Sequence, residues 1–381
     1  RWVDYNARLS TVFQETRPVA EVAILGRTAD HWSATGLERD PIHLQPGYLH
    51  RLWEPLSQLG IGSDYLHEAV LQSAEVENGL LKIGPMAYRL LIVADAVSLG
   101  PETADAIRRF AECGGKVVFV GHAPDRAPGL MNAVGNDGKV RDAIKAAMDA
   151  GAQVRGAPPE GVDSRELREW TGGVLGQVSF PRTLSVRSPH RALYALRHRA
   201  PDAYLIFLAN THREDAIKTR VDFPLGDSGL WRWNPETGER DPYEWAQDAG
   251  GFDIDLHPLE SVLVVTGGKR KDMPGPKEPR QSPGTFRIAT PWTVTFFPVN
   301  SDKSFELTLP SLEDFTTNGD PRVRTFAGTA IYRTTFDPGQ SGFTSISLGR
   351  DNDFISEVEL NGKKLDVIWY GSRPLELGDA L

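Results

Sequence analysis

Residues 88–121, YRLLIVADAVSLGPETADAIRRFAECGGKVVFVG, decide the fold class of the first part of the chain. YRLLIVAD (88–95) and KVVFVG (116–121) are continuous apolar runs of strand length. The segment between them predicts a helix with Pro101 in its first turn and Gly114 past its end. Buried strands separated by helices are typical of a parallel sheet covered on both faces, with right-handed crossovers.

The same alternation extends to both sides of this stretch. VAEVAIL (19–25) predicts an earlier strand, and DGKVRDAIKAAMDAG (137–151) predicts a second helix that ends in glycine. These segments together predict a flavodoxin-like α/β domain over residues 18–160. The sequence after the first strand, GRTADHW (26–32), lacks the second and third glycines of a dinucleotide-binding loop, and no P-loop is present. We therefore expect this domain to bind no nucleotide.

From about Leu184 the hydrophobic period changes to two, with turn signals every several residues. This pattern predicts a small antiparallel β-sandwich over residues 161–267. Residues 268–285 combine Pro, Gly and Lys without periodicity, and they predict a linker.

The end of the chain contains a strong hairpin signal. ISEVEL (355–360) and KKLDVIWY (363–370) flank Asn361-Gly362, and both central positions of a tight type I′ turn need a positive φ. By period two, one core-facing set is Val358 and Leu360, and the other contains Leu365, Val367 and Trp369. We expect a galactose-binding-like jelly-roll sandwich over residues 286–381, truncated because a sandwich needs further strands after such a hairpin.

The predicted fold class is therefore multidomain α/β plus all-β: a flavodoxin-like parallel sheet followed by two antiparallel β-sandwiches, the last truncated. Residues 1–17 predict an amphipathic helix ended by Pro18, with apolar residues at helical spacing. Because this helix has no start signal, we expect it to continue from an upstream domain.

Composition excludes some classes of function. The chain has 381 residues and a formal net charge of −9, and its one basic cluster, Lys269–Lys271, lies in the predicted linker. We therefore expect no nucleic-acid partner. The longest apolar runs are too short to cross a bilayer, so no membrane partner is expected. The single cysteine, Cys113, excludes an internal disulfide and a Cys-rich zinc site, and its position near a helix end favours a small buried hydrophobe.

Polar and aromatic residues gather between the first predicted strand and the next. They are Tyr48, His50, Trp53, Asp64, Tyr65 and His67. Aromatic faces with Asp or His side chains suit sugar rings, and loops at the carboxyl ends of parallel strands are where such sheets meet ligands. The alternative interpretation is that this segment packs a helix and that Trp53 and Tyr65 line a domain interface.

Other catalytic and metal patterns are weak. The histidines show no metal-binding spacing, and no nucleophile elbow is present. Glycoside hydrolysis needs a pair of carboxylates. The candidates Asp64, Glu68, Asp95, Glu102 and Glu260 are not distinguished from one another by sequence.

The order of features resembles the region that follows the catalytic barrel in the α-L-rhamnosidases of glycoside hydrolase family 106. The segments that carry this resemblance are DYNARLSTVFQETRPVAEVAIL (4–25), DYLHEAVLQSAEVENGLLKIGPMAYRLLIVAD (64–95), PETADAIRRFAECGGKVVFVG (101–121), LIFLANT (205–211), LWRWNPETGE (230–239), LHPLESVLVV (256–265), PWTVTFFPV (291–299), FAGTAIYRTTF (326–336) and NGKKLDVIW (361–369).

The resemblance implies a parent enzyme that hydrolyses terminal α-L-rhamnosyl linkages with two barrel glutamates. Those glutamates and an assisting calcium ion would lie upstream of Arg1, so no catalytic residue and no cofactor are expected in this chain. Residues 1–17 would be the last barrel helix, and the rest would pack on the barrel or rim its pocket. The implied partner is an oligosaccharide or rhamnosylated glycan, and the implied location is secreted or periplasmic, with the cytoplasm left open.

Two rival hypotheses remain. One is a different barrel hydrolase, such as a β-galactosidase-like enzyme. The other is a non-catalytic carbohydrate-binding module, in which Trp292, Trp369 and Tyr370 would stack on sugars.

Overall fold

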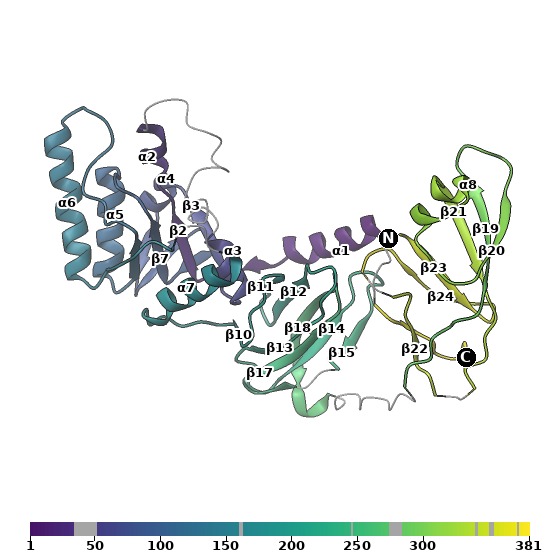
Figure 1. The fold of residues 1–381 in the computed structure, drawn as a ribbon. Helices are drawn as coiled ribbons and strands as arrows, with labels where there is room; N and C mark the ends of the chain where they lie inside the picture. The colour runs from purple at the N-terminus through teal and green to yellow at the C-terminus, as the bar shows by residue number, and fades with distance from the viewer. Residues whose placement is uncertain are drawn as a thin grey trace. The chain divides into compact units, whose positions relative to one another are not determined.

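The computed structural model describes residues 1–33, 52–159, 163–244, 247–273, 284–339, 342–349, 354–371 and 373–381 (Figure 1). The chain divides into two compact units, each described by itself. The first comprises Arg1–Lys277, Leu348–Ser356 and Ile368–Arg373, and the second comprises Glu278–Ser347, Glu357–Val367 and Pro374–Leu381. Within the described residues, none of the helices has the length and apolarity that a bilayer crossing requires.

A five-stranded parallel sheet lies in the first unit. Its spatial order is β3 (Ser63–Leu66), β2 (Val22–Leu25), β7 (Leu90–Ala94), β8 (Lys116–Val120) and β9 (Gln153–Arg155). All neighbouring pairs are parallel. Side chains of β2 and β7 are buried on both faces, which explains their continuous apolar sequences. The predicted parallel sheet is confirmed. The edge strands β3 and β9 were not predicted from the sequence.

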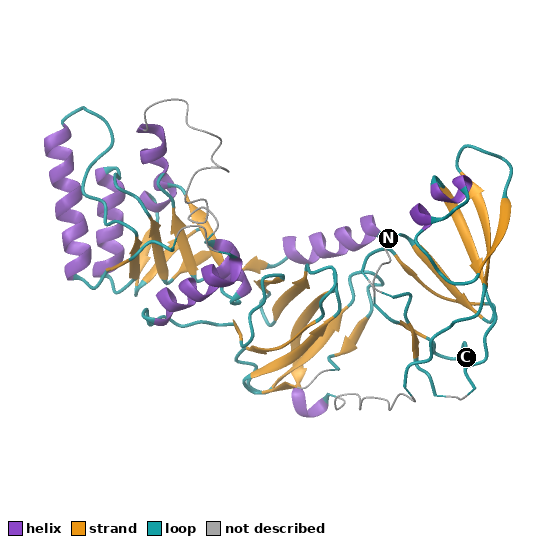
Figure 2. Ribbon diagram, in the orientation of Figure 1, coloured by secondary structure: helices purple, strands orange, loops and turns teal. Residues whose placement is uncertain are grey.

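Helices cover both faces of this sheet, as Figure 2 shows. On one face α4 (Glu68–Gln72), α5 (Pro101–Glu112) and α6 (Ala133–Asp149) share a core with inward residues such as Leu91 and Phe119. On the other face α3 (Trp53–Gln58) and α7 (Ser164–Gly176) pack on Ile24 and Ile92. A short helix, α2 (Thr28–Ser33), follows β2. Two-sided burial is therefore as predicted.

Helix α5 has the predicted end signals. Pro101 occupies its first turn, and Gly114 has φ +87 just past its end. Gly115 lies so close to the ring of Phe110 that an added Cβ would be 2.2 Å from it. Cys113 is exposed, so its predicted burial is wrong. Phe110 and Ala111 lie on the face of the helix that is buried against the sheet. Cys113 lies just beyond the end of the helix and outside that face.

A small antiparallel meander precedes β7 and was missed at the sequence level. It contains β4 (Glu75–Glu77), β5 (Leu80–Ile83) and β6 (Met86–Tyr88). Asn78 and Gly79 join β4 to β5 with φ values of +52 and +72. The Asn-Gly signal of a two-residue hairpin was therefore present in this segment too.

Two antiparallel sheets follow in the first unit. One has the order β1 (Arg17–Pro18), β11 (Leu193–Arg199), β12 (Tyr204–Asn210), β18 (Ser261–Lys269), β14 (Ser228–Trp233) and β15 (Arg240–Pro242). The other has the order β10 (Ser185–Val186), β13 (Ile217–Asp222), β17 (Gly251–Leu256) and β16 (Gln247–Asp248). Their inward side chains share one core that includes Ile206, Leu208 and Phe252. The predicted antiparallel sandwich is confirmed.

Helix α1 (Trp2–Gln14) packs on the six-stranded sheet. Leu9, Val12 and Phe13 contact a cluster that contains Leu205 and Leu263. The predicted amphipathic helix is therefore present, although it ends three residues earlier because Arg17 and Pro18 form β1 beside β11. Whether it closes an upstream barrel stays a prediction.

A buried ion pair joins the parallel sheet to the sandwich. Glu21, just before β2, and Arg197, in β11, have side chains only 8% and 2% exposed. The Arg197 guanidinium donates to the Glu21 carboxylate, and the Thr183 hydroxyl also donates to that carboxylate. The backbone N–H of Val19 donates to the Arg197 carbonyl at 3.0 Å. Buried polar contacts thus join the parallel sheet to the sandwich within the first unit.

The second unit contains smaller sheets. β20 (Phe305–Leu309), β19 (Trp292–Pro298) and β21 (Gly328–Arg333) form one sheet, and β22 (Ser345–Ile346) pairs with β25 (Leu375–Glu376). The core of the larger sheet centres on Phe296, whose ring stacks on Phe305 at 4.7 Å. Among the described residues of this unit, η4 (Phe315–Thr317) and α8 (Pro321–Arg324) are short helices. The jelly-roll assignment stays a prediction.

The terminal hairpin has the predicted two-residue turn. It joins β23 (Ser356–Leu360) to β24 (Lys363–Ile368), with φ +52 at Asn361 and φ +79 at Gly362. The predicted core-facing set of β24 is wrong in part. Leu365 and Val367 are half-buried, and the fully buried side chain is Ile368, at 1% exposure.

Replacing Gly362 by Val is expected to destabilise this hairpin by about 1 kcal/mol or more, because a β-branched residue resists a positive φ. No atom lies within 4 Å of the Cβ position, so the effect should come from the backbone alone. Hydrogen exchange of the β23 and β24 amides measures it. Gly319→Val is the matched control, since its φ is not positive and its Cβ position is also open. Equal exchange in both variants would contradict the assignment.

Candidate functional site

The structure brings together two of the six residues predicted to bind sugar. Trp53 begins α3 and is 44% exposed. Tyr65 lies in the edge strand β3, and its hydroxyl forms hydrogen bonds with the backbone of Leu52 and Trp53. Burial raises the pKa of Tyr65 to about 12.

Asp64 and His67 are separated from this pair. Neighbouring residues of a strand point to opposite faces, and Asp64 accepts a hydrogen bond from the Tyr88 hydroxyl at 2.9 Å on the α4–α6 side. His67 caps α4, where its Nδ1 accepts from the backbone N–H of Ala69 at 3.2 Å. Tyr48 and His50 lie outside the described residues. Sugar binding by these six residues stays a prediction.

The carboxyl edge of the parallel sheet carries a polar group that combines Asp95, one of the candidate carboxylates, with two residues that the sequence analysis did not name. Arg27 follows β2, Asp95 follows β7 and His122 follows β8. Arg27 Nη1 lies 3.0 Å from Asp95 Oδ2, and His122 Nδ1 lies 2.7 Å from Asp95 Oδ1. Gly121 packs on Asp95, since an added Cβ would lie 2.4 Å from Oδ1. This edge is the usual ligand side of such a sheet, and here a carboxylate occupies it.

We expect the chain to bind neither NAD nor ATP. The turn after β2 has no glycine-rich loop, and the Asp95 carboxylate at the same edge would repel phosphate. Calorimetric titration with each nucleotide checks this, and the expected result is no heat of binding. A micromolar dissociation constant for either nucleotide would contradict the prediction.

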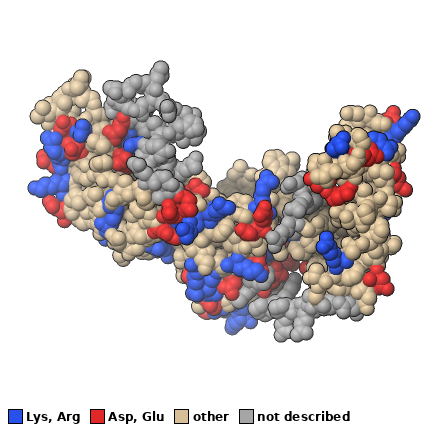
Figure 3. Space-filling model, viewed as in Figure 1, with Lys and Arg blue, Asp and Glu red and all other residues tan. Residues whose placement is uncertain are grey.

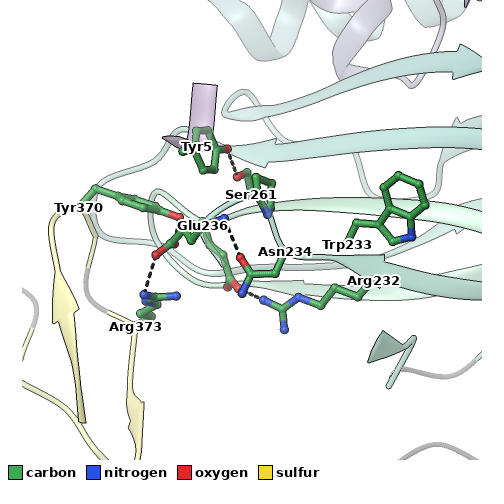
Figure 4. Close-up of a pocket in the computed structure, with 10 residues that line it drawn as sticks. Tyr5, Arg232, Trp233, Asn234, Glu236, Ser261, Tyr370 and Arg373 are labelled. Atoms are coloured by element: carbon green, nitrogen blue, oxygen red, sulfur yellow. Dashed lines mark hydrogen bonds and ion pairs between the residues drawn. The ribbon is translucent and has the colours of Figure 1, made fainter. Parts of the chain in front are cut away.

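A polar pocket lies in the first unit beside the turn that joins β14 to β15 (Figure 4). Its space is about 10 Å³, close to what one water molecule needs. The lining residues are Tyr5, Arg232, Trp233, Asn234, Pro235, Glu236, Glu260, Ser261, Tyr370 and Arg373. They come from α1, from the end of β14 and the turn that follows it, from the residues at and just before the start of β18, and from the segment Ile368–Arg373.

Glu236 is the centre of this pocket. Its side chain is 7% exposed and accepts three hydrogen bonds from the segment Ile368–Arg373. The Tyr370 hydroxyl donates at 2.7 Å, the Arg373 guanidinium at 3.0 Å and the Trp369 indole N–H at 3.3 Å. Burial and the nearby Glu236 carboxylate both raise the pKa of Tyr370, so its hydroxyl stays a donor. Arginine and two aromatic donors thus hold one carboxylate.

The turn that carries Glu236 is fixed from two sides. The Glu236 backbone N–H donates to Asn234 Oδ1 at 2.9 Å, within the turn. Arg8 of α1 donates to the carbonyl of Pro235 at 2.9 Å and to the carbonyl of Glu236 at 2.5 Å. Gly238 has φ +83, and an added Cβ would lie 3.2 Å from Arg8. Glycine is therefore suited to this position both by conformation and by space.

Trp369 is half-buried, and its contacts explain why. Its ring meets Tyr5 edge-on at 5.9 Å and Tyr370 edge-on at 4.5 Å, while its N–H reaches Glu236. It is an aromatic anchor within the first unit, where its ring and its N–H both contact neighbouring side chains. Sequence reasoning named Trp369 and Tyr370 as aromatic candidates but did not connect them with Glu236.

The second carboxylate of the pocket holds a different turn. Glu260 accepts from the backbone N–H of His257 at 2.8 Å, and Arg232 lies 3.4 Å from its other oxygen. Leu259, inside this turn, has φ +59. Glu260 is thus engaged by donors that are near in sequence, whereas Glu236 is engaged by the segment Ile368–Arg373. Through Glu236, the pocket acts as a polar clamp between segments that are distant in sequence.

Two of the remaining candidate carboxylates, Glu68 and Glu102, lie near Gly100: an added Cβ there would be 3.5 Å from Oε2 of Glu68 and 3.8 Å from Oε2 of Glu102. Glu68 accepts from the Thr103 hydroxyl at 2.6 Å and from the Gly100 N–H at 3.3 Å, next to the start of α5. In the part of the chain that the structure describes, no group of three or more His, Cys, Asp or Glu side chains could hold a metal ion. On the face shown in Figure 3, basic and acidic side chains are interspersed.

The chain thus combines a parallel α/β domain with antiparallel β-sheets. No protein-family model matches the sequence, and no curated protein matches it. Among solved structures, the chain is similar to a rhamnosidase from Novosphingobium sp. PP1Y, with a TM-score of 0.65 and 18% sequence identity. The match covers 100% of this chain and 35% of that chain. The likeness therefore shows a shared fold over about a third of that protein's length.

Other similar structures are also glycoside hydrolases. A GH42 β-galactosidase, Gan42B from G. stearothermophilus, matches with a TM-score of 0.40 and 15% identity, over 68% of this chain and 42% of that chain. An α-L-fucosidase from Paenibacillus thiaminolyticus matches with a TM-score of 0.41 and 13% identity, over 70% of this chain and 51% of that chain. Because these TM-scores are below 0.5, the two matches do not define the fold of this chain.

Proposed function

We propose that the chain is the supporting region of a glycoside hydrolase that cleaves terminal α-L-rhamnosyl linkages. The observation that carries this proposal is the fold match to a rhamnosidase along the whole chain. Because the chain spans 35% of that protein, the proposal assigns catalysis to another part of the polypeptide. The domain limits in this proposal are those predicted from the sequence. The proposed substrate is a rhamnosylated glycan.

The structural role of the described carboxylates supports this assignment. Glu236 accepts hydrogen bonds that hold the segment Ile368–Arg373, and Glu260 and Glu68 accept hydrogen bonds that fix a turn and a helix end. A glycosidase needs two carboxylates that flank the scissile bond, one as the acid and one as the base or nucleophile. In this proposal the clamp at Glu236 gives the region rigidity and takes no part in the bond cleavage.

The purified chain is expected to release no nitrophenol from an aryl α-L-rhamnoside. An assay with the chain alone checks this, and a polypeptide extended toward the amino end is the positive arm. Turnover by the chain alone that is lost in Glu236→Gln or Glu260→Gln would contradict the assignment of catalysis elsewhere. Turnover of a β-galactoside, and none of the rhamnoside, by the extended polypeptide would favour the rival hydrolase hypothesis.

A further inference from the structure

The parallel sheet has a topological switch point between its strands β2 and β7. The chain passes from β2 to β3 on one side, and then crosses to β7, β8 and β9 on the other side. Open parallel sheets bind ligands outside the carboxyl ends of the two strands that flank such a point. Arg27 follows β2 and Asp95 follows β7, so their ion pair of 3.0 Å spans the switch point. His122 reaches the same carboxylate from the end of β8.

The backbone on both sides of Asp95 Oδ1 has an uncommon conformation. Asp95 has φ +49, which few residues other than glycine adopt. Gly121 has φ +81, and it leaves the space that Asp95 Oδ1 occupies, since an added Cβ would lie 2.4 Å from that oxygen. Backbone conformations of this kind are concentrated at functional sites, where surrounding contacts hold them in place.

Hydrogen bonds tie together the three segments that follow β2, β7 and β8. Asp30, in α2, accepts from the backbone N–H of Val97 at 2.8 Å and from that of Ser98 at 3.0 Å. Ser98 is bridged to Arg126, in the segment after β8, and the N–H of Leu99 donates to the Arg126 carbonyl at 3.0 Å. The positions of Arg27, Asp95 and His122 are thus fixed before any ligand binds, which lowers the entropic cost of binding.

These three side chains leave one acceptor and one donor group unused. Because a carboxylate can only accept, Nδ1 of His122 donates to Asp95, and the neutral ring has its lone pair at Nε2. The His122 side chain is 66% exposed, and Nε2 has no hydrogen-bond partner among the described residues. Arg27 donates to Asp95 through Nη1, while its Nε is buried without a partner in the described part of the chain. The guanidinium therefore has donor capacity that the protein does not use.

Charge makes ions poor ligands at this point. The charge of Arg27 is balanced by Asp95, and the lone pair of His122 would oppose an anion. A cation would meet the guanidinium, and within the described residues no group of three or more His, Cys, Asp or Glu side chains could hold a metal ion. A hydroxyl group, by contrast, is both a donor and an acceptor. The unused groups are therefore suited to a neutral ligand with more than one hydroxyl.

We propose that Arg27 and His122, positioned by Asp95, bind a neutral sugar at the switch point of the α/β domain. One sugar hydroxyl donates to Nε2 of His122, and a neighbouring sugar oxygen accepts from Arg27. Asp95 holds both side chains through its two oxygens and makes no contact with the sugar. The site goes beyond the proposed function, because it binds sugar without cleaving a glycosidic bond.

The test is a titration of the full chain with two neutral glycosides, methyl α-L-rhamnoside and methyl β-D-galactoside, at pH 8, above the ordinary titration range of imidazole. The backbone amide resonance of Gly121 should shift saturably with at least one glycoside, and not with glucuronate at matched ionic strength. His122→Ala should weaken binding by about threefold to tenfold, the effect of losing one hydrogen bond. The side chain is exposed, so this variant should fold. Arg126→Gln is the matched control, because its side chain is 60% exposed and lies in the same segment after β8.

Three results would overturn the proposal: no saturable shift with either glycoside, equally tight binding of glucuronate, or unchanged binding in His122→Ala. Equal affinity for glycerol would overturn the assignment to a sugar, because any small diol would then be sufficient. Binding of the galactoside alone would support the site and count against a rhamnosylated ligand. Hydrolysis of an aryl α-L-rhamnoside is measured separately, so failure of the proposed function and failure of this site are distinguishable.

Discussion

Replacing Glu21 by Gln is expected to lower the free energy of unfolding of the first unit by about 3–5 kcal/mol, the cost of removing one partner of a buried ion pair. Gln keeps the shape of Glu21 and can still accept from Thr183, at 3.2 Å from its backbone N–H. It cannot neutralise Arg197, whose side chain is 2% exposed. Calorimetric or denaturant unfolding of the chain measures the change.

Two further variants separate charge from packing. Glu21→Leu combined with Arg197→Met removes both charges, and it should recover much of the loss, because a buried apolar pair replaces the ion pair at little cost. Glu169→Gln is the control: its contact with Arg165 is 4.0 Å long, with side chains 68% and 70% exposed. Such exposed pairs contribute about 0–1 kcal/mol. If Glu21→Gln changes the free energy of unfolding as little as Glu169→Gln does, the Glu21–Arg197 junction is hydrated.

Replacing Glu236 by Ala is expected to destabilise the segment Ile368–Arg373 by about 2–4 kcal/mol, because hydrogen bonds to charged groups contribute about 1.5–3 kcal/mol each and are not additive. The variant leaves the Tyr370 hydroxyl, the Trp369 N–H and the Arg373 guanidinium without their shared acceptor. Faster hydrogen exchange of the backbone amides at 369–371 measures the release of this segment.

The matched control lies in the same turn. Glu239 is exposed. Among the described residues, its side chain accepts a hydrogen bond from the nearby Thr237 hydroxyl, at 3.1 Å. Glu239→Ala should therefore leave exchange at 369–371 unchanged. Glu236→Gln should fall between the two variants, since it keeps an acceptor but loses the charge that faces Arg373. Equal exchange in Glu236→Ala and Glu239→Ala would contradict the clamp.

The carboxylates of Glu21 and Glu236 have a structural role, unlike the two carboxylates of a catalytic pair. Glu21 and Glu236 each join segments more than a hundred residues apart in the chain, through Arg197 and Arg373. Loss of either carboxylate would leave a buried donor group without its partner, and this is why both interactions matter to the first unit. A chain with this role in a larger glycosidase would supply a rigid neighbour to the catalytic region, as the proposed function requires.

Local patterns in the sequence were sufficient for much of the fold. The continuous apolar runs of β2, β7 and β8, with the end signals of α5, predicted a parallel sheet, since burial on both faces requires such runs. The turn at Asn361-Gly362 followed from backbone sterics. The meander at Asn78-Gly79 was missed although it carries the same signal, because its strands of three and four residues are too short for a clear period.

The candidate site was much less predictable. The six residues proposed to bind sugar are close in sequence, but those that the structure describes lie on two faces of a sheet, because neighbouring residues of β3 alternate. The Glu236 clamp combines segments from distant parts of the chain.

The sequence alone determined what short-range physics controls: which segments are helix or strand, which turns need glycine, and which broad classes of partner the charge makes unfavourable. Only the tertiary structure decided which charges meet. Burial of Glu21 and Glu236 depends on side chains brought together by folding, and no local spacing records those long-range contacts.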